Sequence, residues 1–307
     1  MIKVDLITGF LGAGKTTFLD GYVRYLVSKG QRVAIIENDF GAVNVDMMLL
    51  SDFIKENCTI EMIAGACDAH CHARRFKTKL IALGMQGFDR VIIEPSGIYD
   101  VDEFFDVIRE EPLERWYETG SVISIVDATM NRNMSKETKY IFATQLLCAG
   151  SILVSKSESD SDRQEMITFL NDVLEESGGK RRVDDVVIMK PWGELDTDDY
   201  EKMAQSGYKS DVISKMWFDK REEYTSLYYM NLDFDRDKIK EIIDKLFESD
   251  EYGHIHRVKG FIGDENGWFS VNVTRDSFSI QPSGEGQKVI IVIGEKLIEE
   301  KIGVLFG

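Results

Sequence analysis

The chain has few of the features that mark secreted, membrane-spanning or nucleic-acid-binding proteins. Four cysteines in 307 residues are too few for a disulfide framework, and the spacing of Cys67 and Cys71 beside histidines suits reduced thiols better. Apolar runs such as 122–126 and 289–293 are far too short to span a bilayer. The first residues enter a strand-like run directly, without a charged-then-apolar signal. We therefore expect a cytoplasmic protein.

Basic residues are also scarce. The sequence has 37 Lys and Arg against 54 Asp and Glu, which gives a net charge of −17. This charge repels a phosphate backbone and an anionic bilayer, so we expect neither nucleic-acid nor membrane partners. Any anion that the protein binds must be held by local groups. A typical domain has ~150 residues, so the length of the chain predicts about two domains.

One motif supplies such groups. Residues 9–16, GFLGAGKT, match the pattern G-x-x-x-x-G-K-[ST] between a strand-like run and a helix-like run. The glycines let backbone N–H groups surround phosphate oxygens, the lysine adds a cation at the β- and γ-phosphates, and the threonine hydroxyl completes a Mg²⁺ shell. A turn that only packs helix against strand is the structural alternative. The expected nucleotide-binding residues are Gly9, Gly12, Ala13, Gly14, Lys15, Thr16 and Thr17.

Short β-branched runs alternate with amphipathic stretches through the first 192 residues. This alternation predicts an α/β fold, a P-loop NTPase with a mostly parallel sheet covered on both faces. Strands are expected at 33–37, 90–94, 122–127, 152–155 and 186–189, and helices near 17–28, 74–83, 101–109, 136–147 and 162–175.

The pattern changes after this domain of residues 1–192. Residues 193–223 lack clear periodicity and are expected to form a linker. Residues 224–307 predict a smaller α+β C-terminal domain with an antiparallel sheet. Its expected order is a strand, a helix at 236–247, strands at 255–262, 268–274, 278–281 and 288–293, and a helix at 295–301.

Three further motifs follow predicted strands. Glu94 ends a buried strand in EPSG, where it could hold Mg²⁺, while Gly97 could bring a backbone N–H to the γ-phosphate. Carboxylates in ENDFG at 37–41, Glu37 and Asp39, could position the attacking water in a switch segment. Solvent-facing acids at strand or loop ends are the alternative for all three carboxylates.

The third motif, SKSE at 155–158, is the nearest match to the Asn/Thr-Lys-x-Asp loop that recognises guanine. Ser155 and Glu158 replace two of its positions, whereas Lys156 is retained and can cover the base plane. A carboxylate at 158 can still accept two guanine donors, so guanine is favoured. A serine-rich surface loop is the alternative.

Taken together, these motifs resemble the CobW family of P-loop GTPases. The resemblance rests on residues 9–17, 37–41, 61–65 (EMIAG), 94–97, 155–156 and 257–261 (RVKGF), nearly end to end. It implies Mg²⁺-dependent GTP hydrolysis coupled to delivery of a divalent transition metal to a client metalloprotein or cofactor-assembly protein. In that mechanism the catalytic groups would be Lys15, Glu37, Asp39 and Glu94, with Thr16 and Glu94 at the Mg²⁺. A nucleotide-dependent homodimer stays open.

The chain departs from this family at its metal motif. Members usually carry Cys-x-Cys-Cys after the glycine that matches Gly65, whereas this chain reads ACDAHCH at 66–72. On a helix Cys67, His70 and Cys71 would share one face, and such ligands suit Zn²⁺, Co²⁺ or Ni²⁺. Half-buried thiols beside surface histidines are the alternative. The pair His254 and His256 could form a second metal patch.

Two other functional classes compete with a GTPase metallochaperone. A nucleotide-gated scaffold or activator would bind its client through the acidic surface while GTP only fixed its shape. A metabolite kinase would need an arginine-bearing lid, and the sequence has no Arg-rich lid segment. Metal-dependent turnover separates the first alternative from a chaperone.

Overall fold

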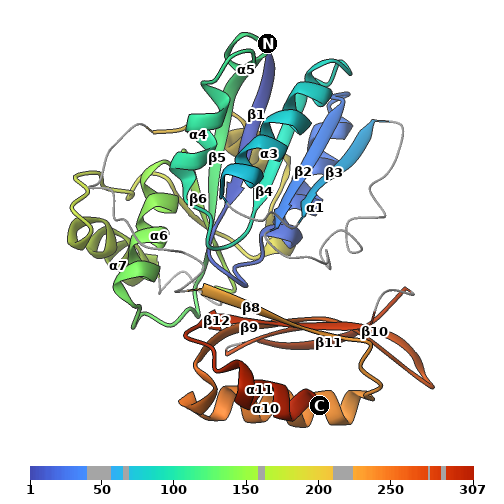
Figure 1. Cartoon of the computed structure of the whole chain (residues 1–307). Coiled ribbons are helices and arrows are strands. Elements are labelled where there is room, and N and C mark those ends of the chain that lie inside the picture. Colours follow the sequence, from blue (N-terminus) through green and yellow to red (C-terminus); the bar gives the residue numbers. More distant parts are fainter. Residues whose placement is uncertain (40–56, 65–68, 158–162, 210–223, 276, 285–287) are drawn as a thin grey trace. The chain divides into compact units, whose positions relative to one another are not determined.

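The computed structural model describes residues 1–39, 57–64, 69–157, 163–209, 224–275, 277–284 and 288–307. The chain forms two compact units, Met1–Met216 and Trp217–Gly307. Each unit has its own sheet (Figure 1). Among the described residues, no helix is both long enough and apolar enough to cross a membrane.

Unit 1 is built on a seven-stranded sheet in the order β3-β2-β4-β1-β5-β6-β7. All neighbouring strands are parallel, which confirms the predicted α/β fold. Its strands are β1 (Ile2–Thr8), β2 (Val33–Asp39), β3 (Cys58–Ala64), β4 (Arg90–Pro95), β5 (Tyr117–Asp127), β6 (Ser151–Ser155) and β7 (Val187–Met189). Its helices are α1 (Lys15–Ser28), α3 (Ala69–Gly84), α4 (Val101–Ile108), α5 (Leu113–Trp116), α6 (Lys136–Leu147), α7 (Arg163–Glu176), η3 (Trp192–Glu194) and α8 (Thr197–Ala204).

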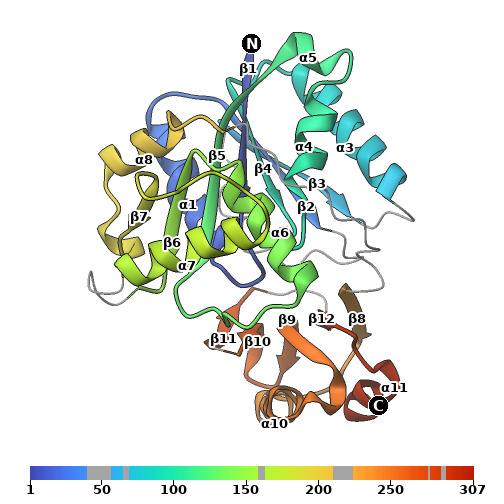
Figure 2. The same ribbon diagram turned by 90° about the vertical axis from the view of Figure 1, so that its left-hand side faces the viewer.

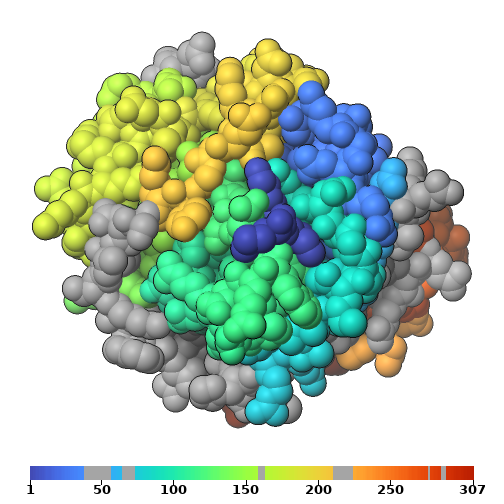
Figure 3. Space-filling view, turned by 90° about the horizontal axis from the view of Figure 1, so that it is seen from above, coloured from blue at the N-terminus to red at the C-terminus, as the bar shows by residue number. Residues whose placement is uncertain are grey.

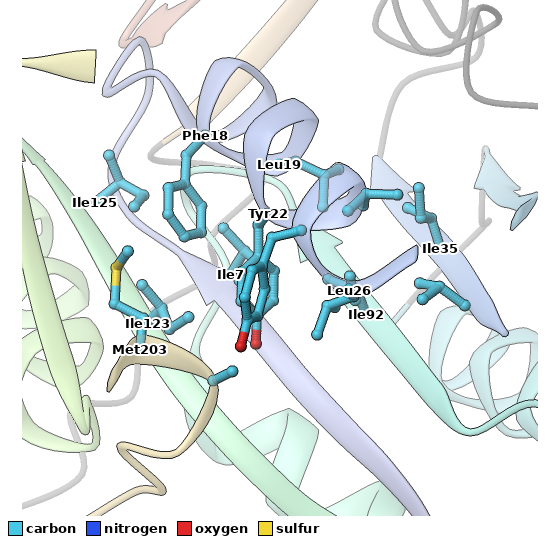
Figure 4. Packing of buried hydrophobic residues seen from close by; sticks show 14 of the residues in the cluster. Ile7, Phe18, Leu19, Tyr22, Leu26, Ile35, Ile92, Ile123, Ile125 and Met203 are labelled. Atoms are coloured by element: carbon cyan, nitrogen blue, oxygen red, sulfur yellow. The ribbon is translucent and has the colours of Figure 1, made fainter. Parts of the chain in front are cut away.

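Helices cover both faces of this sheet, because its strands are apolar on both faces. Helices α1 and α8 lie on one face, whereas α3, α4 and α6 lie on the other (Figure 2). The core under α1 joins residues from β1, β2, β4 and β5 with Phe18, Leu19 and Tyr22 of the helix (Figure 4). Met203 of α8 closes the same core.

The parallel arrangement sends the carboxyl ends of the strands to one edge of unit 1. The start of β1 lies at the opposite end, near the middle of the face seen in Figure 3, and Met1 is exposed. Strand β1 is central and is followed directly by the glycine-rich loop. In open α/β sheets ligands bind in the crevice outside the carboxyl ends of the strands, so the loop is at the expected edge.

A buried ionic network joins β1, β4 and α1 away from that edge. Arg90 Nη1 lies 2.5 Å from Asp5 Oδ2, and the Tyr22 hydroxyl donates to the same oxygen at 2.7 Å. The backbone N–H of Ser121 donates to Asp5 Oδ1 at 2.8 Å. Burial, and then the charge of Asp5, raise the pKa of Tyr22 well above its usual value. The aspartate therefore has three donors, as a buried charge requires.

Unit 1 contains elements that the sequence did not predict, among them β3 and α8. Strand β3 was not expected, and it pairs with β2 at the edge of the sheet. Helix α8 forms within the segment expected as a linker, and its N-terminus is capped by Asp196 in a capping box with Asp199. Met203 and Ala204 are buried in unit 1, so residues up to this helix pack with the first unit.

Unit 2 is an antiparallel sheet in the order β11-β10-β9-β12-β8. Its elements are β8 (Tyr224–Met230), α10 (Arg236–Glu248), η4 (Asp250–Tyr252), β9 (His254–Asp264), β10 (Gly267–Thr274), β11 (Ser277–Ser283), β12 (Val289–Glu295) and α11 (Glu299–Phe306). Helices α10 and α11 pack on one face of this sheet (Figures 1 and 2). The α+β architecture is confirmed. The last helix begins later than expected, because Glu295 still pairs with Tyr224 and His254 as part of β12.

Candidate nucleotide-binding site

The loop after β1 can form only with glycine at defined positions. Gly14 caps α1 in the left-handed region at φ 94°, and Gly12 has φ 76°. A Cβ on Gly9 would lie 2.2 Å from the carbonyl oxygen of Ile125. The loop therefore rests on β5 and leads into the N-terminus of α1, whose partial positive charge favours an anion.

Lys15 opens α1 and lies over this loop. Its side chain is 7% exposed, and Nζ donates to the carbonyl oxygens of Gly9 at 2.9 Å and Phe10 at 3.3 Å. A buried ammonium, a glycine-rich loop and a helix N-terminus are the donor set that binds phosphates. These residues fit a nucleoside triphosphate.

Thr16 contacts the acid that the sequence placed at the end of β4. Its hydroxyl donates to Glu94 Oε1 at 2.8 Å, although 78 residues separate the two. Glu37 lies opposite Glu94 in the pairing of β2 with β4 and is also buried. Hydroxyl and carboxylate oxygens are the ligands that Mg²⁺ prefers, so this group fits a magnesium ion. Asp39 ends β2, but its side chain lies outside the described residues.

The loop after β4 packs against the glycine-rich loop. A Cβ on Gly97 would lie 2.5 Å from the backbone nitrogen of Leu11 and 2.8 Å from the carbonyl carbon of Phe10. Only glycine allows this approach, because both obstacles are backbone atoms. The structure thus brings Gly97 to the phosphate-binding loop, whereas the side chain of Thr17 is exposed in the first turn of α1.

The segment expected to recognise the base also contacts this loop. The buried Ser155 hydroxyl lies 2.8 Å from the carbonyl oxygen of Ala13 and 3.1 Å from that of Val126. Lys156 follows in the left-handed region at φ 54°. Its Nζ lies 2.5 Å from Asp127 Oδ2 at the end of β5. Glu158 lies outside the described residues.

Sequence reasoning missed Asp127 and Trp192 at this site. Asp127 pairs in register with Ser155 at the carboxyl edge of the sheet, and its place at a strand end was the available signal. The ring of Trp192 would lie 3.1 Å from a Cβ on Gly14. Trp192 comes from η3, far along the chain, and no local pattern signals this contact.

The expected transition-metal ligands are only partly described. Cys67 lies outside the described residues, while His70 and Cys71 fall in the first turn of α3, with side chains outside the described part. Cys58 and Cys148 lie within the described residues, and both are buried. Burial raises the pKa of Cys58 to about 11, so this thiol stays protonated at neutral pH.

The pair His254 and His256 lies on β9 with ring centroids 4.8 Å apart. His256 Nε2 is 3.2 Å from Glu295 Oε1. Burial, and then the neighbouring His256, lower the pKa of His254. Across the described ranges, however, no three His, Cys, Asp or Glu side chains are arranged to hold a metal ion. The idea of a metal patch here therefore gains no support from the described residues.

Comparison with known proteins identifies the family to which unit 1 is similar. The profile of the family described as CobW/HypB/UreG, nucleotide-binding domain, matches residues 3–183. The chain belongs to this family. The match covers β1 from its second residue through β6, the glycine-rich loop, Glu94 and the segment with Ser155 and Lys156.

Several relatives in the CobW/HypB/UreG family have names that state a role. The zinc chaperone YjiA of Escherichia coli (strain K12) is 32% identical over 178 residues, which cover 54% of this chain and 52% of the relative. The zinc chaperone YeiR of the same strain is 28% identical and covers 60% and 54%. The zinc-regulated GTPase metalloprotein activator 1 of Schizosaccharomyces pombe is 24% identical and covers 100% and 82%. The chain thus spans about half the length of the two bacterial relatives.

Solved structures are similar at lower identity. The Zn(II)-bound YjiA GTPase from E. coli is 19% identical, covers 99% of this chain and 98% of that one, and has a TM-score of 0.39. The hydrogenase maturation factor HypB from Archaeoglobus fulgidus is 13% identical, covers 66% and 86%, and has the same TM-score of 0.39.

Proposed function

We propose that this protein is a GTP-hydrolysing metallochaperone that delivers a divalent transition metal to a client metalloprotein or cofactor-assembly protein. The hydrogen bond between Thr16 and Glu94 carries the nucleotide part of the proposal. It joins the helix that follows the phosphate-binding loop to a carboxylate on the adjacent strand, as a Mg²⁺–triphosphate site requires.

Each residue of the site has a distinct task in this proposal. Lys15 neutralises charge that develops on the transferred phosphoryl group, and Thr16 and Glu94 hold the Mg²⁺ that GTP brings. The N–H of Gly97 contacts the γ-phosphate, and Glu37 or Asp39 orients the attacking water. Lys156 covers the guanine plane while Glu158 accepts its donors. Most of the catalysis is positioning and charge stabilisation, so few other groups are needed.

The metal part of the proposal rests on Cys67, His70 and Cys71 and on the names of the relatives. Two thiolates and an imidazole suit Zn²⁺, and Co²⁺ and Ni²⁺ also bind such ligands. Relatives named as zinc chaperones and as a metalloprotein activator favour zinc as the cargo. The acidic surface expected from the charge of −17 would meet a basic patch on the client.

Phosphate release from GTP in the presence of Mg²⁺ tests the catalytic part. Wild-type protein should hydrolyse GTP, and Lys15→Ala or Thr16→Ala should lower the rate by about 100-fold or more, because each loses a group that contacts the phosphates or the Mg²⁺. Thr168→Ala is the matched control, since Thr168 is exposed on α7 and its hydroxyl donates to the carbonyl oxygen of Gln164 in that helix. Near-wild-type rates in both variants of the loop would contradict the assignment.

A nucleotide-gated scaffold or activator is the second candidate. The same contacts of the phosphate-binding loop favour it, because they would bind GTP whether or not the nucleotide is hydrolysed. The two functions differ in how turnover responds to metal. A chaperone should change its hydrolysis rate when Zn²⁺, Co²⁺ or Ni²⁺ is added, because cargo and GTP act on one cycle. A scaffold should bind GTP with slow turnover that metals leave unchanged.

A further inference from the structure

Gln145 is a buried side chain of α6 that contacts the nucleotide site from outside the known motifs. It is 0% exposed. Its Nε2 donates to the carbonyl oxygen of Gly97 at 3.0 Å and to that of Tyr99 at 3.4 Å. Both acceptors belong to the segment between β4 and α4. One amide therefore ties α6 to the segment expected to sense the γ-phosphate.

This segment is held in a docked position on the phosphate-binding loop. Gly97 packs on the backbone of Phe10 and Leu11 so closely that a Cβ would lie within 2.8 Å of both. A turn fixes the following residues, because the N–H of Tyr99 donates to the carbonyl oxygen of Ser96 at 3.0 Å. Docking of this kind brings Gly97 beside Phe10 and Leu11 of the phosphate-binding loop.

The geometry also sets the orientation of the amide. Two carbonyl oxygens face Nε2, and a flipped amide would place an acceptor against two acceptors. Gln145 Oε1, in contrast, is buried without a hydrogen-bond partner among the described residues. The side chain thus satisfies the two carbonyls at the expense of its own oxygen. Hydrogen bonding of the glutamine's own polar atoms therefore does not explain the orientation of its amide.

Two buried hydroxyls on the face of the sheet covered by α6 are incompletely satisfied in the same way as Gln145 Oε1. Thr8 and Ser124 pair in register across β1 and β5, and within the described part of the chain neither hydroxyl has a hydrogen-bond partner. Their neighbours Ile7 and Ile123 face the α1 core, so Thr8 and Ser124 face the side that α6 covers (Figure 2). Incompletely satisfied buried groups mark a place where a rearrangement can gain hydrogen bonds.

We propose that Gln145 is a positioning residue that stabilises the docked segment and thereby sets the preference for GTP over GDP. A GDP molecule has no phosphate that reaches Gly97, so only GTP uses the docked position. Holding the segment in advance lowers the ordering cost of GTP binding. Without the amide, two buried carbonyls lose their donor, and the docked position becomes less favourable. The inference rests on the proposed GTP-binding function.

Equilibrium binding of GDP and of a non-hydrolysable GTP analogue tests the inference. Gln145→Met keeps the length and flexibility of the side chain and removes the amide. We expect the affinity for the analogue to fall by about tenfold, equal to about 1.4 kcal/mol, while the affinity for GDP changes less than about twofold. Thr144→Val is the matched control, because Thr144 is also buried and donates to the carbonyl oxygen of Ile141 within α6.

The outcomes separate this inference from the proposed function. Equal losses for both nucleotides, an unchanged ratio in Gln145→Met, or the same loss of preference in Thr144→Val would overturn the role of Gln145 while leaving GTP binding intact. Wild-type protein that binds neither nucleotide would overturn the proposed function itself. Should Gln145→Met not fold, Gln145→Asn decides by the same ratio, because its shorter amide cannot reach both carbonyls.

Discussion

Glycine is required in the nucleotide site because other backbone segments approach it closely. At Gly9 the obstacle to a Cβ is the carbonyl oxygen of Ile125, and at Gly97 it is the backbone of Leu11. Neither obstacle is a side chain that could move aside. The sequence motif records these two requirements, while the structure shows which segments impose them.

Gly97→Ala should therefore impair the site more than the fold. The added methyl group must displace the segment from Leu11, so we expect single-turnover hydrolysis of GTP to fall by about tenfold or more, with GDP binding changed little. Gly303→Ala is the control, because nothing lies within 4 Å of a Cβ there and alanine favours the interior of α11 by about 0.5–1 kcal/mol. Hydrolysis in Gly97→Ala at the wild-type rate would show that this approach has no part in catalysis.

The ion pair of Lys156 with Asp127 is the second feature at the scale of single residues. Lys156 adopts a left-handed conformation that is uncommon for residues other than glycine. Asp127 holds its ammonium, and the Asp127 carboxylate also accepts from the N–H of Thr129 at 2.9 Å. The ion pair thus fixes the lysine side chain at the carboxyl edge of the sheet, where the proposed guanine site lies.

Asp127→Asn should reduce the preference for GTP over ATP by about fivefold, because the lysine that covers the base loses its charged partner. Competition binding of the two nucleotides measures this ratio. Glu176→Gln is the control, since Glu176 pairs with Lys139 on the exposed surface, where an ion pair contributes little. A ratio unchanged in Asp127→Asn would assign base recognition to other groups.

At the scale of elements, helix α8 illustrates why a short helix is difficult to predict from the sequence. Its eight residues make less than three turns, and only Met203 and Ala204 among them are buried. Tyr200 adds ring contacts with Phe18 and Tyr25 of α1. The helix depends on these tertiary contacts, because so short a helix is not stable alone.

Met203→Ala should therefore destabilise unit 1. The side chain is fully buried among residues of α1 and the sheet, and truncation in a core costs about 2–5 kcal/mol. Met85→Ala is the control at 78% exposure, where we expect less than about 0.5 kcal/mol. Chemical denaturation of both variants, monitored by a spectroscopic signal from unit 1, measures the change in the free energy of unfolding. Equal stability would mean that α8 is not part of the core.

At the scale of the whole molecule, the nucleotide site and the expected metal site can be coupled only if GTP and the metal act on the same segment of the chain. Residues 65–68 lie along the chain between β3 and α3, and the expected metal ligands start there. The neighbouring strands β2 and β4 carry Glu37 and Glu94. A metal bound at this segment would lie between the two along the chain, and if it acts on the segment that responds to GTP, linkage predicts reciprocal effects of about 1–3 kcal/mol.

Cys67→Ser combined with Cys71→Ser should weaken Zn²⁺ binding and abolish any effect of Zn²⁺ on GTP affinity, while basal GTP affinity stays near wild type. Competition with a zinc-binding dye and nucleotide titrations with and without Zn²⁺ measure both quantities. Cys148→Ala is the control, because this cysteine is buried elsewhere in unit 1. Wild-type zinc affinity in the double variant would move the site elsewhere, and GTP affinity independent of zinc in wild-type protein would mean two unlinked sites.

Periodicity and spacing within the sequence determined the α/β class, the antiparallel second unit and the identity of the phosphate-binding loop, because these depend on residues near one another in the chain. The contacts of Thr16 with Glu94, of Ser155 with Ala13 and of Gln145 with Gly97 span 78, 142 and 48 residues. Strand order brings these residues together, and no local pattern encodes it. Trp192 and α8 escaped prediction for the same reason: their surroundings exist only after the parallel sheet has assembled. Asp127 differs, because its place at a strand end was a signal within the sequence.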